Sequence, residues 1–481
     1  MNQPLYDRPA DLPADLADAT ASQLLAGFSA GSITPVDAVE ACLARIAATE
    51  PACNAIIALL DGPALAAAER SGQRWREGTA GPLEGVPYGL KDIIATAGVA
   101  STGGSALYLD HVPTETAAHA RRLADAGGIL LAKLGTFEFA CGGADNQAFG
   151  RVHNPWDLTR TTGGSSSGSG AAVAAGMLPL AIGTDTGGSI RIPAAYCGIT
   201  GLKPTYGRVP RHGVMGLSWT LDHAGPMTRS AEDCALMLGV IAGHDERDAT
   251  SSMRPVPDYL GALSQSVSGL KLARPRGWFE DCFHPAFAAV YEEAVAALGG
   301  LGIDVVDVEV PEVEVAAAAG WAICYAEMFS LHEGHIATIE ERDTMGAGLL
   351  GAGPFVTAND YLRALRWRPA FQRSLAAALG DCAAFVVPGA TTAPPVMGDM
   401  LVDTGTAVVD WLAVATRNHI PFNYAGLPGL CLPCGLADGL PVSLQLVGWP
   451  HDDATLLRIG AAYQAVTDHH RAKPPILSAV A

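Results

Sequence analysis

Two groups of small residues hold the serines best suited to nucleophilic chemistry. The first, "TTGGSSSGSGAAVAAG", runs from Thr161 to Gly176, and the second, "DTGGSIRIP", contains Ser189. A Gly/Ser stretch on its own is typical of a flexible linker. A serine hydroxyl is a weak nucleophile, however, and it needs a base to take its proton. The sequence therefore has to supply a base for one of these serines.

Lys91 is the first candidate for that base. It ends the short apolar run of "VPYGLKD", so it is expected at the end of a strand, followed by Asp92. A lysine in this position is most often a solvated charge. It can act as a base only if desolvation or cationic neighbours keep it neutral near pH 7. A catalytic Lys91 is therefore predicted to be buried.

Two other serine motifs compete with this interpretation. Ser166 stands in a GxSxG pattern, the nucleophile elbow of α/β-hydrolases, which needs a strand directly before it. The preceding "HNPWDLTRTTG" is polar and contains a proline, which argues against an elbow. Ser268 and Lys271 match the SxxK pattern of β-lactamases, but no KTG follows. Chance explains a match of four residues.

Cysteines and histidines give weaker signals for a metal. Cys431 and Cys434 form a CxxC without a second pair, and buried small residues at a strand and turn explain them better. His332 and His335 are three residues apart, whereas the zinc motif HExxH places its histidines four apart. We expect neither a metal nor an organic cofactor.

Composition limits the classes of function. The 481 residues carry a formal charge of −19, which argues against a nucleic-acid groove. The start has no basic and apolar signal region, and the most apolar run, "AAVAAGMLPLAIG", is too short to cross a bilayer. The ten scattered cysteines are typical of a chain kept reduced. These features predict a cytoplasmic protein without a membrane span.

The elements that would position the candidate residues alternate between strand and helix. Thr34 and Pro35 begin a helix as cap and first residue, with apolar residues at helical spacing behind them. Buried strands are predicted at "ILLAK", "LKLARP" and "CAAFVVP", which indicates an α/β sheet. Residues 245–265 and 343–360 are polar and turn-rich. Between them a helical segment carries Trp321, Tyr325 and Met328, predicted as core with some pocket lining.

Taken together, "VPYGLKD", "GGSSSGSG" and "DTGGSIRIP" resemble the amidase signature family, whose pattern is unbroken from Gly163 to Pro193. Further pieces such as "GLKPTYGRVP" and "NYAGLPGLCLPCG" extend the resemblance over most of residues 20–465, weakening between about 245 and 380. The resemblance implies an α/β amidase signature fold: a large mixed central β-sheet flanked by helices, with a variable helical lobe over the active site. It also implies residues 1–15 as an N-terminal extension and 16–475 as a single domain, with about 245–380 roofing the substrate.

The resemblance also implies roles for single residues. Ser189 would be the nucleophile, Ser165 the bridging serine after a cis peptide bond from Gly164, and Lys91 the base. The glycines before Ser189 allow a tight turn whose amides converge on one point, a form suited to an oxyanion hole. We expect its donors to be the following backbone N–H groups: Thr186, Gly187, Gly188 and Ser189.

Other positions are expected to support these residues. Asp185 and Arg191 flank the turn and are expected to brace it. Cys141, Gly142 and Gly143 lie where the family lines its substrate pocket. The preceding "LGTFEFA" has Leu-Gly where many members have Thr-Asn.

These observations predict a serine hydrolase that cleaves the C–N bond of carboxylic amides through an acyl-enzyme on Ser189. An aryl or other apolar acyl group is favoured, and esters or carbamates (urethanes) could react by the same route. The partner would be a small-molecule substrate, with the oligomeric state open and a homodimer included. One alternative is the A subunit of a tRNA-dependent glutamyl/aspartyl amidotransferase, although "SWTLDHAGPMTRS" looks more like the free-standing amidases. Another is a binding protein that kept the fold, against which the three intact catalytic positions argue.

Overall fold

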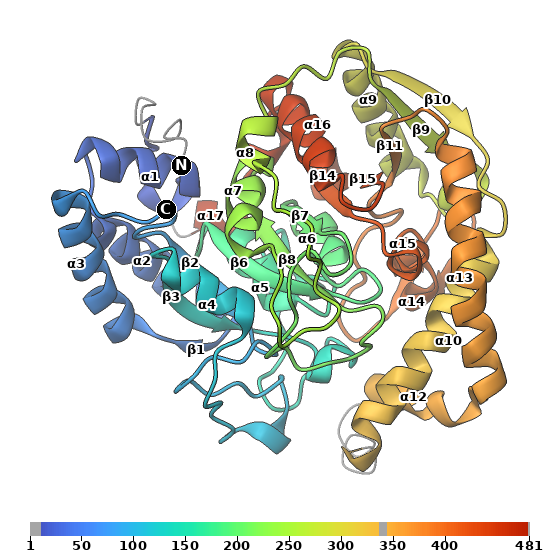
Figure 1. Cartoon of the computed structure of the whole chain (residues 1–481), viewed down its shortest axis with the longest axis horizontal. Helices are drawn as coiled ribbons and strands as arrows, with labels where there is room; N and C mark the ends of the chain where they lie inside the picture. Colours follow the sequence, from blue (N-terminus) through green and yellow to red (C-terminus); the bar gives the residue numbers. More distant parts are fainter. Residues whose placement is uncertain (1–10, 336–343, 480–481) are drawn as a thin grey trace.

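A mixed eleven-stranded sheet runs through the molecule in the computed structural model, which describes residues 11–335 and 344–479 (Figure 1). Strand β2 runs parallel to β3 and β6, and β9 runs parallel to β10 and β11, while the other neighbours are antiparallel. This arrangement confirms the predicted mixed sheet. In sheet order the strands are β1 (Ile56–Leu59), β3 (Ile129–Leu134), β2 (Pro87–Lys91), β6 (Leu180–Asp185), β8 (His223–Thr228), β7 (Thr200–Lys203), β14 (Gly429–Ala437), β15 (Leu440–Gly448), β11 (Ala384–Pro388), β9 (Lys271–Pro275) and β10 (Asp304–Val308).

Two short hairpins and a set of flanking helices complete the described structure. The hairpins are β4 (His153–Asn154) with β5 (Asp157–Thr161), and β12 (Leu401–Asp403) with β13 (Val408–Asp410). The α-helices are α1 (Ala21–Ala30), α2 (Pro35–Cys53), α3 (Asp61–Glu77), α4 (Ala118–Asp125), α5 (Ser167–Ala174), α6 (Arg191–Cys197), α7 (Ala231–Ile241), α8 (Tyr259–Ala262), α9 (Pro285–Gly300), α10 (Val313–His332), α12 (Thr344–Gly351), α13 (Ala358–Leu379), α14 (Trp411–Ala415), α15 (Ile420–Ala425), α16 (Asp453–Val466) and α17 (Ile476–Ala479). Among the described helices, none is long and apolar enough to cross a membrane.

Helix α2 begins at Pro35 with Thr34 as its N-cap residue, as the sequence predicts. The side chain of Thr34 accepts a hydrogen bond from the backbone N–H of Asp37, and the Asp37 carboxylate accepts from the backbone N–H of Thr34. This reciprocal pair satisfies donors that the first helical turn leaves unpaired. Val39 and Ile46 are buried on the face that meets the core.

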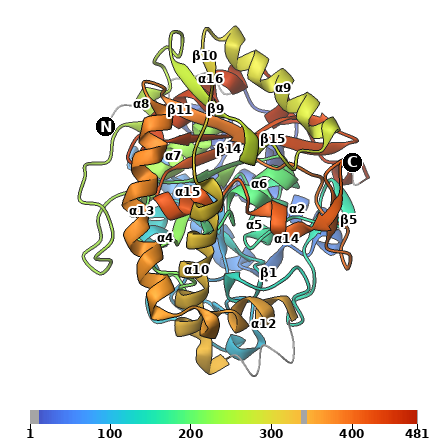
Figure 2. The same ribbon diagram turned by 90° about the vertical axis from the view of Figure 1, so that its right-hand side faces the viewer.

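The region where the family resemblance weakens divides into two parts. Its first half contributes β9, α9 and β10 to the far edge of the sheet, whereas its second half forms the helices α10, α12 and α13. Figures 1 and 2 show these helices standing side by side as a lobe at one end of the molecule. The predicted helical segment, residues 316–341, is confirmed as α10 up to His332, and its last residues, 336–341, lie outside the described part of the chain.

The Gly/Ser stretch forms a buried helix rather than a linker. All eight residues of α5 are buried. A Cβ added at Gly168 would lie 2.2 Å from the backbone nitrogen of Gly135 and 2.4 Å from the carbonyl oxygen of Ala55. Only a residue without a side chain permits this approach of α5 to the chain around β1 and β3.

Candidate active site

Lys91 lies at the end of β2, inside the sheet. Strand β6 is one of the two parallel neighbours of β2, and its residue Thr184 contacts the side chain of Lys91. The Nζ atom of Lys91 donates hydrogen bonds to Oγ of Ser165 and to Oγ1 of Thr184, each at 2.8 Å. The side chain is fully buried, as the sequence predicts for a lysine base.

Burial sets the protonation of Lys91. Desolvation lowers its pKa from 10.5 to about 7, against the opposing effect of the carboxylates of Asp185 and Asp222. A lysine with this pKa is about half neutral at pH 7. The neutral amine has a free lone pair, so it can accept a proton from the Ser165 hydroxyl.

Ser165 and Ser189 line one cavity although they belong to different segments. The peptide bond between Gly164 and Ser165 is cis. The backbone N–H of Ser166 donates to the carbonyl oxygen of Ser189 at 3.2 Å, which holds the two segments together. The structure therefore brings Lys91, Ser165 and Ser189 to one place.

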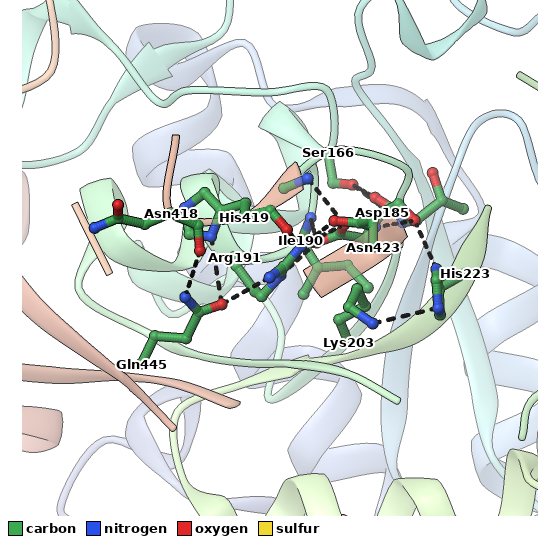
Figure 3. A network of polar contacts seen from close by, with 12 residues as sticks. Ser166, Asp185, Ile190, Arg191, Lys203, His223, Asn418, His419, Asn423 and Gln445 are labelled. Atoms are coloured by element: carbon green, nitrogen blue, oxygen red, sulfur yellow. Dashed lines mark hydrogen bonds and ion pairs between the residues drawn. The ribbon is translucent and has the colours of Figure 1, made fainter. Parts of the chain in front are cut away.

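A buried ion pair supports the turn that carries Ser189. The guanidinium of Arg191 donates to both carboxylate oxygens of Asp185, each at 3.0 Å, and to the amide oxygens of Gln445 and Asn423 (Figure 3). Burial alone would raise the pKa of Asp185, but the adjacent Arg191 charge holds it well below its usual range. The pair connects the turn to α15 and β15, which confirms the predicted bracing role.

The same carboxylate takes one of the expected oxyanion-hole donors. The backbone N–H of Gly188 donates to Oδ1 of Asp185 at 2.9 Å, and Gly188 is not among the residues that line the cavity. Thr186, Gly187 and Ser189 do line it. The oxyanion hole stays a proposal, and it rests on these three residues, because the Gly188 amide is already bound to Asp185.

Thr186 is fixed by a second carboxylate. Its hydroxyl donates to Oδ1 of Asp222 at 2.6 Å. Asp222 also accepts from the backbone N–H groups of Leu217 and Ser218 at 2.9 and 3.0 Å. Burial raises the pKa of Asp222. A loop of the chain, residues 217–222, is thereby attached to the turn that carries the nucleophile candidate.

The cavity that reaches both serines is narrow and apolar. Its volume is about 70 Å³, and among the described residues no charged side chain lines it. Of the three residues expected at the substrate pocket, Cys141 and Gly142 line this cavity and Gly143 is not among its lining residues. The remaining walls are formed by the following residues: Phe137, Ala140, Ile192, Leu217, Trp321, Cys324, Met328, Leu349, Trp411, Leu412 and Thr416.

A second cavity, of about 270 Å³, meets the first at three shared residues, Ala140, Thr186 and Leu217. Its lining differs in character, because it includes charged side chains such as Arg211 and Asp248. Apolar and polar spaces thus adjoin at the proposed oxyanion turn.

The competing motifs serve structural purposes. Ser166 Oγ donates to the Thr184 carbonyl at 3.1 Å, and Lys271 pairs with Asp381 at the surface at 2.7 Å. Cys431 and Cys434 are buried free thiols, and burial raises the pKa of Cys431 to about 12.

The histidines of "LHEGH" have a packing role as well. His332 and His335 stack on Phe139, with ring centroids 4.9 and 5.5 Å apart. Within residues 11–335 and 344–479, no group of three or more His, Cys, Asp or Glu side chains is placed to hold a metal ion.

Comparison with known proteins agrees with this geometry. The family model described as Amidase matches residues 37–457. The chain belongs to the amidase signature family. One similar solved structure is the inhibitor-bound form of a vestigial protein complex described as revealing the evolutionary origins of an s-triazine catabolic enzyme. The two chains are 31% identical and superimpose with a TM-score of 0.88, over 93% of this chain and 98% of the other. The peptide amidase PAM in complex with the competitive inhibitor chymostatin superimposes with a TM-score of 0.83 at 31% sequence identity. The match covers 95% of this chain and 99% of that chain.

A relative found by sequence comparison is named as an amidotransferase subunit rather than as an amidase. The A subunit of glutamyl-tRNA(Gln) amidotransferase from Chloroflexus aggregans is 40% identical, over 96% of this amidase-family chain and 99% of the relative. Family membership thus supports an enzyme acting at C–N bonds, and the proteins similar to it include both amidases and one component of an amidotransferase.

Several residues of the site are absent from the sequence-based prediction. Thr184, the second partner of Lys91, stands in the "GTDTGGS" motif, and a strand ending beside the base could have indicated it. Asp222, Trp411 and Thr416 reach the site from loops and helices without a local chemical signal.

Proposed function

We propose that this protein hydrolyses amides with an apolar acyl group by a Ser–Ser–Lys relay. The observation that carries the proposal is the position of buried Lys91, 2.8 Å from Ser165, beside an uncharged cavity that also exposes Ser189. The sequence-based roles of these three residues are retained in the proposal.

In the first step Oγ of Ser189 attacks the carbonyl carbon of the amide. Its proton passes to Oγ of Ser165, while the Ser165 proton passes to Nζ of neutral Lys91. The carbonyl oxygen becomes an oxyanion, and the amides of Thr186, Gly187 and Ser189 are proposed to stabilise it. One such donor is typically worth about 3 kcal/mol in the transition state.

Collapse of the intermediate breaks the C–N bond. The proton returns from Lys91 through Ser165 to the leaving nitrogen, and the amine departs with the acyl group left on Ser189. Water then attacks the ester and loses its proton along the same route, which regenerates Ser189 and releases the acid. An ester or an aryl carbamate also forms a tetrahedral intermediate at its carbonyl, so it could react by the same steps.

The apolar lining favours an aryl or alkyl acyl group. Glutamine would bring a charged ammonium and a carboxylate into the cavity, and burying such groups is costly without a paired charge. No charged side chain among the described residues lines this cavity, which supports an apolar acyl group there, whereas Arg211 and Asp248 line the cavity that adjoins it.

The second candidate is the A subunit of a glutamyl-tRNA(Gln) amidotransferase, which would work in a complex and bring a tRNA partner. The 40% identity to a protein of that name supports it, and by sequence identity alone it is the better supported candidate. Both candidates use the same relay and differ in the amide cleaved and in the need for a partner protein.

The test compares the purified chain on benzoyl and acetyl anilides, short aliphatic amides, aryl carbamates and glutamine. We expect turnover of the benzoyl anilide and covalent labelling of Ser189 by a fluorophosphonate, with both lost in Ser189→Ala. A Ser264→Ala variant is the control, because it changes an exposed serine outside the relay and its framework. Glutamine hydrolysis only in the presence of a partner protein, without activity on anilides, would instead establish the amidotransferase.

A further inference from the structure

Glu327 is a buried carboxylate on α10 that the proposed relay does not use. Its side chain is only 1% exposed. On the same helix, Cys324 and Met328 line the catalytic cavity, three residues before it and one after it. Glu327 thus belongs to the helix that forms one wall of the cavity, but it is not among the residues that line it.

Glu327 accepts hydrogen bonds from two different parts of the chain. Its Oε2 atom accepts from the Ser218 hydroxyl and, at 3.1 Å, from the backbone N–H of Thr220. Its Oε1 atom accepts from the hydroxyls of Thr220 and of Tyr361 on α13, each at 2.9 Å. One side chain thus joins α10 to the 217–222 loop and to α13.

The loop continues this connection to the proposed oxyanion turn. Next to Ser218, Leu217 lines the catalytic cavity, and both residues donate backbone hydrogen bonds to Asp222. Asp222 accepts from the Thr186 hydroxyl, and Thr186 lines the cavity at the turn. A continuous set of polar contacts therefore runs from the helical lobe to the nucleophile's turn.

We propose that Glu327 is a positioning residue that sets the acyl selectivity of the enzyme by holding α10 and the 217–222 loop at a fixed separation. This inference rests on the proposed amide hydrolysis. Loss of the carboxylate would remove the acceptor of four donors. The Ser218 hydroxyl is fully buried and the donors of Thr220 and Tyr361 are half-buried, and a buried donor left unpaired is costly. The wall formed by Cys324, Met328 and Leu217 would then shift, and a large acyl group would lose more contacts than a small one.

The experiment measures kcat/KM on acetyl and benzoyl anilides and reports their ratio. For Glu327→Leu we expect the benzoyl preference to fall about tenfold, mainly through a higher KM for the benzoyl substrate. A merely structural loss would reduce the amount of folded enzyme and lower both values equally, leaving the ratio unchanged. Glu314→Leu, at an exposed position of the same helix, is the matched control and should keep the wild-type ratio.

Glu327→Gln should restore the ratio to within about twofold of wild type, because its amide can keep the same contacts: the hydroxyls of Thr220 and Tyr361 can turn to accept from its NH₂ group. An unchanged ratio in Glu327→Leu, or a Gln variant as impaired as the Leu variant, would overturn the proposal. If the Leu variant does not fold, Tyr361→Phe removes a single donor and should lower the ratio about threefold, and an unchanged ratio there would equally overturn it.

A second readout separates this inference from the proposed function. The rate of Ser189 labelling is compared for a methyl and a decyl fluorophosphonate, which needs no amide turnover. If the wild type labels but cleaves no amide, the substrate class is wrong while the label ratio still tests Glu327. If the wild type neither labels nor cleaves, both proposals fall.

Discussion

The lowered pKa of Lys91 gives the proposed relay a defined dependence on pH. The relay needs the neutral amine, and burial lowers the pKa from 10.5 to about 7. The neutral fraction then rises from about one tenth at pH 6 to about nine tenths at pH 8. We expect kcat/KM for an uncharged amide to rise about tenfold over this interval and to level off above it. An acid limb with its midpoint near the pKa of a solvated lysine would refute the assignment.

The same shift links Lys91 to folding stability. The unfolded chain binds the lysine proton up to about pH 10.5 and the folded chain only up to about pH 7, so unfolding takes up a proton between these values. Stability therefore rises with pH across this window, and the cost of burying the lysine is fully present only below it. A shift of this size corresponds to about 4 kcal/mol at pH 7 and about 2 kcal/mol at pH 9.

Replacing Lys91 by methionine removes this cost while keeping an apolar side chain of similar length. The difference in unfolding free energy between Lys91→Met and wild type should therefore be about 2 kcal/mol more in favour of the variant at pH 7 than at pH 9. Urea denaturation at both pH values measures it, and the effects of other titrating groups cancel in the difference. Lys271→Met at the surface is the control and should show no gain of this kind. A Lys91→Met difference that is independent of pH would refute the reasoning.

Two further substitutions test the framework around the site. Asp185→Asn should lower the free energy of unfolding by about 3–5 kcal/mol in urea denaturation, because it leaves the buried charge of Arg191 without its carboxylate. Asp381→Asn, in an exposed ion pair, is the control and should barely move the denaturation midpoint. Equal effects of the two variants would contradict this reasoning. Gly168→Ala should lower the free energy of unfolding by about 1–3 kcal/mol, since its Cβ would lie 2.2 Å from a backbone nitrogen. Gly239→Ala is the control and should not lower it, because no atom lies within 4 Å of the added Cβ. If Gly168→Ala is as stable as wild type, α5 can move away and the reasoning is wrong.

The three relay candidates could be predicted from sequence because each belongs to a contiguous motif. Ser165 and Ser189 lie in glycine-rich turns, where backbone conformation and side-chain chemistry are encoded together. The burial of Lys91 is predicted from its proposed chemistry, because a lysine acts as a base near pH 7 only when desolvation or cationic neighbours keep it neutral. The contact of the Gly188 amide could not be predicted, because Asp185 both pairs with Arg191 and accepts from that amide, and two roles for one carboxylate cannot be read from its position.

The cavity walls could not be predicted to the same extent. Apolar spacing along α10 indicates a buried face, but it does not say whether protein or substrate covers that face. Trp321, Cys324 and Met328 would read in the same way if they packed only against a neighbouring helix. Even the charge of the cavity depends on the fold, since Glu327 is adjacent in sequence to Met328 yet its carboxylate bonds to the 217–222 loop and α13 and does not line the cavity. The relay motifs contain no information about where the Glu327 carboxylate finds its donors, so they could not predict the character of this cavity.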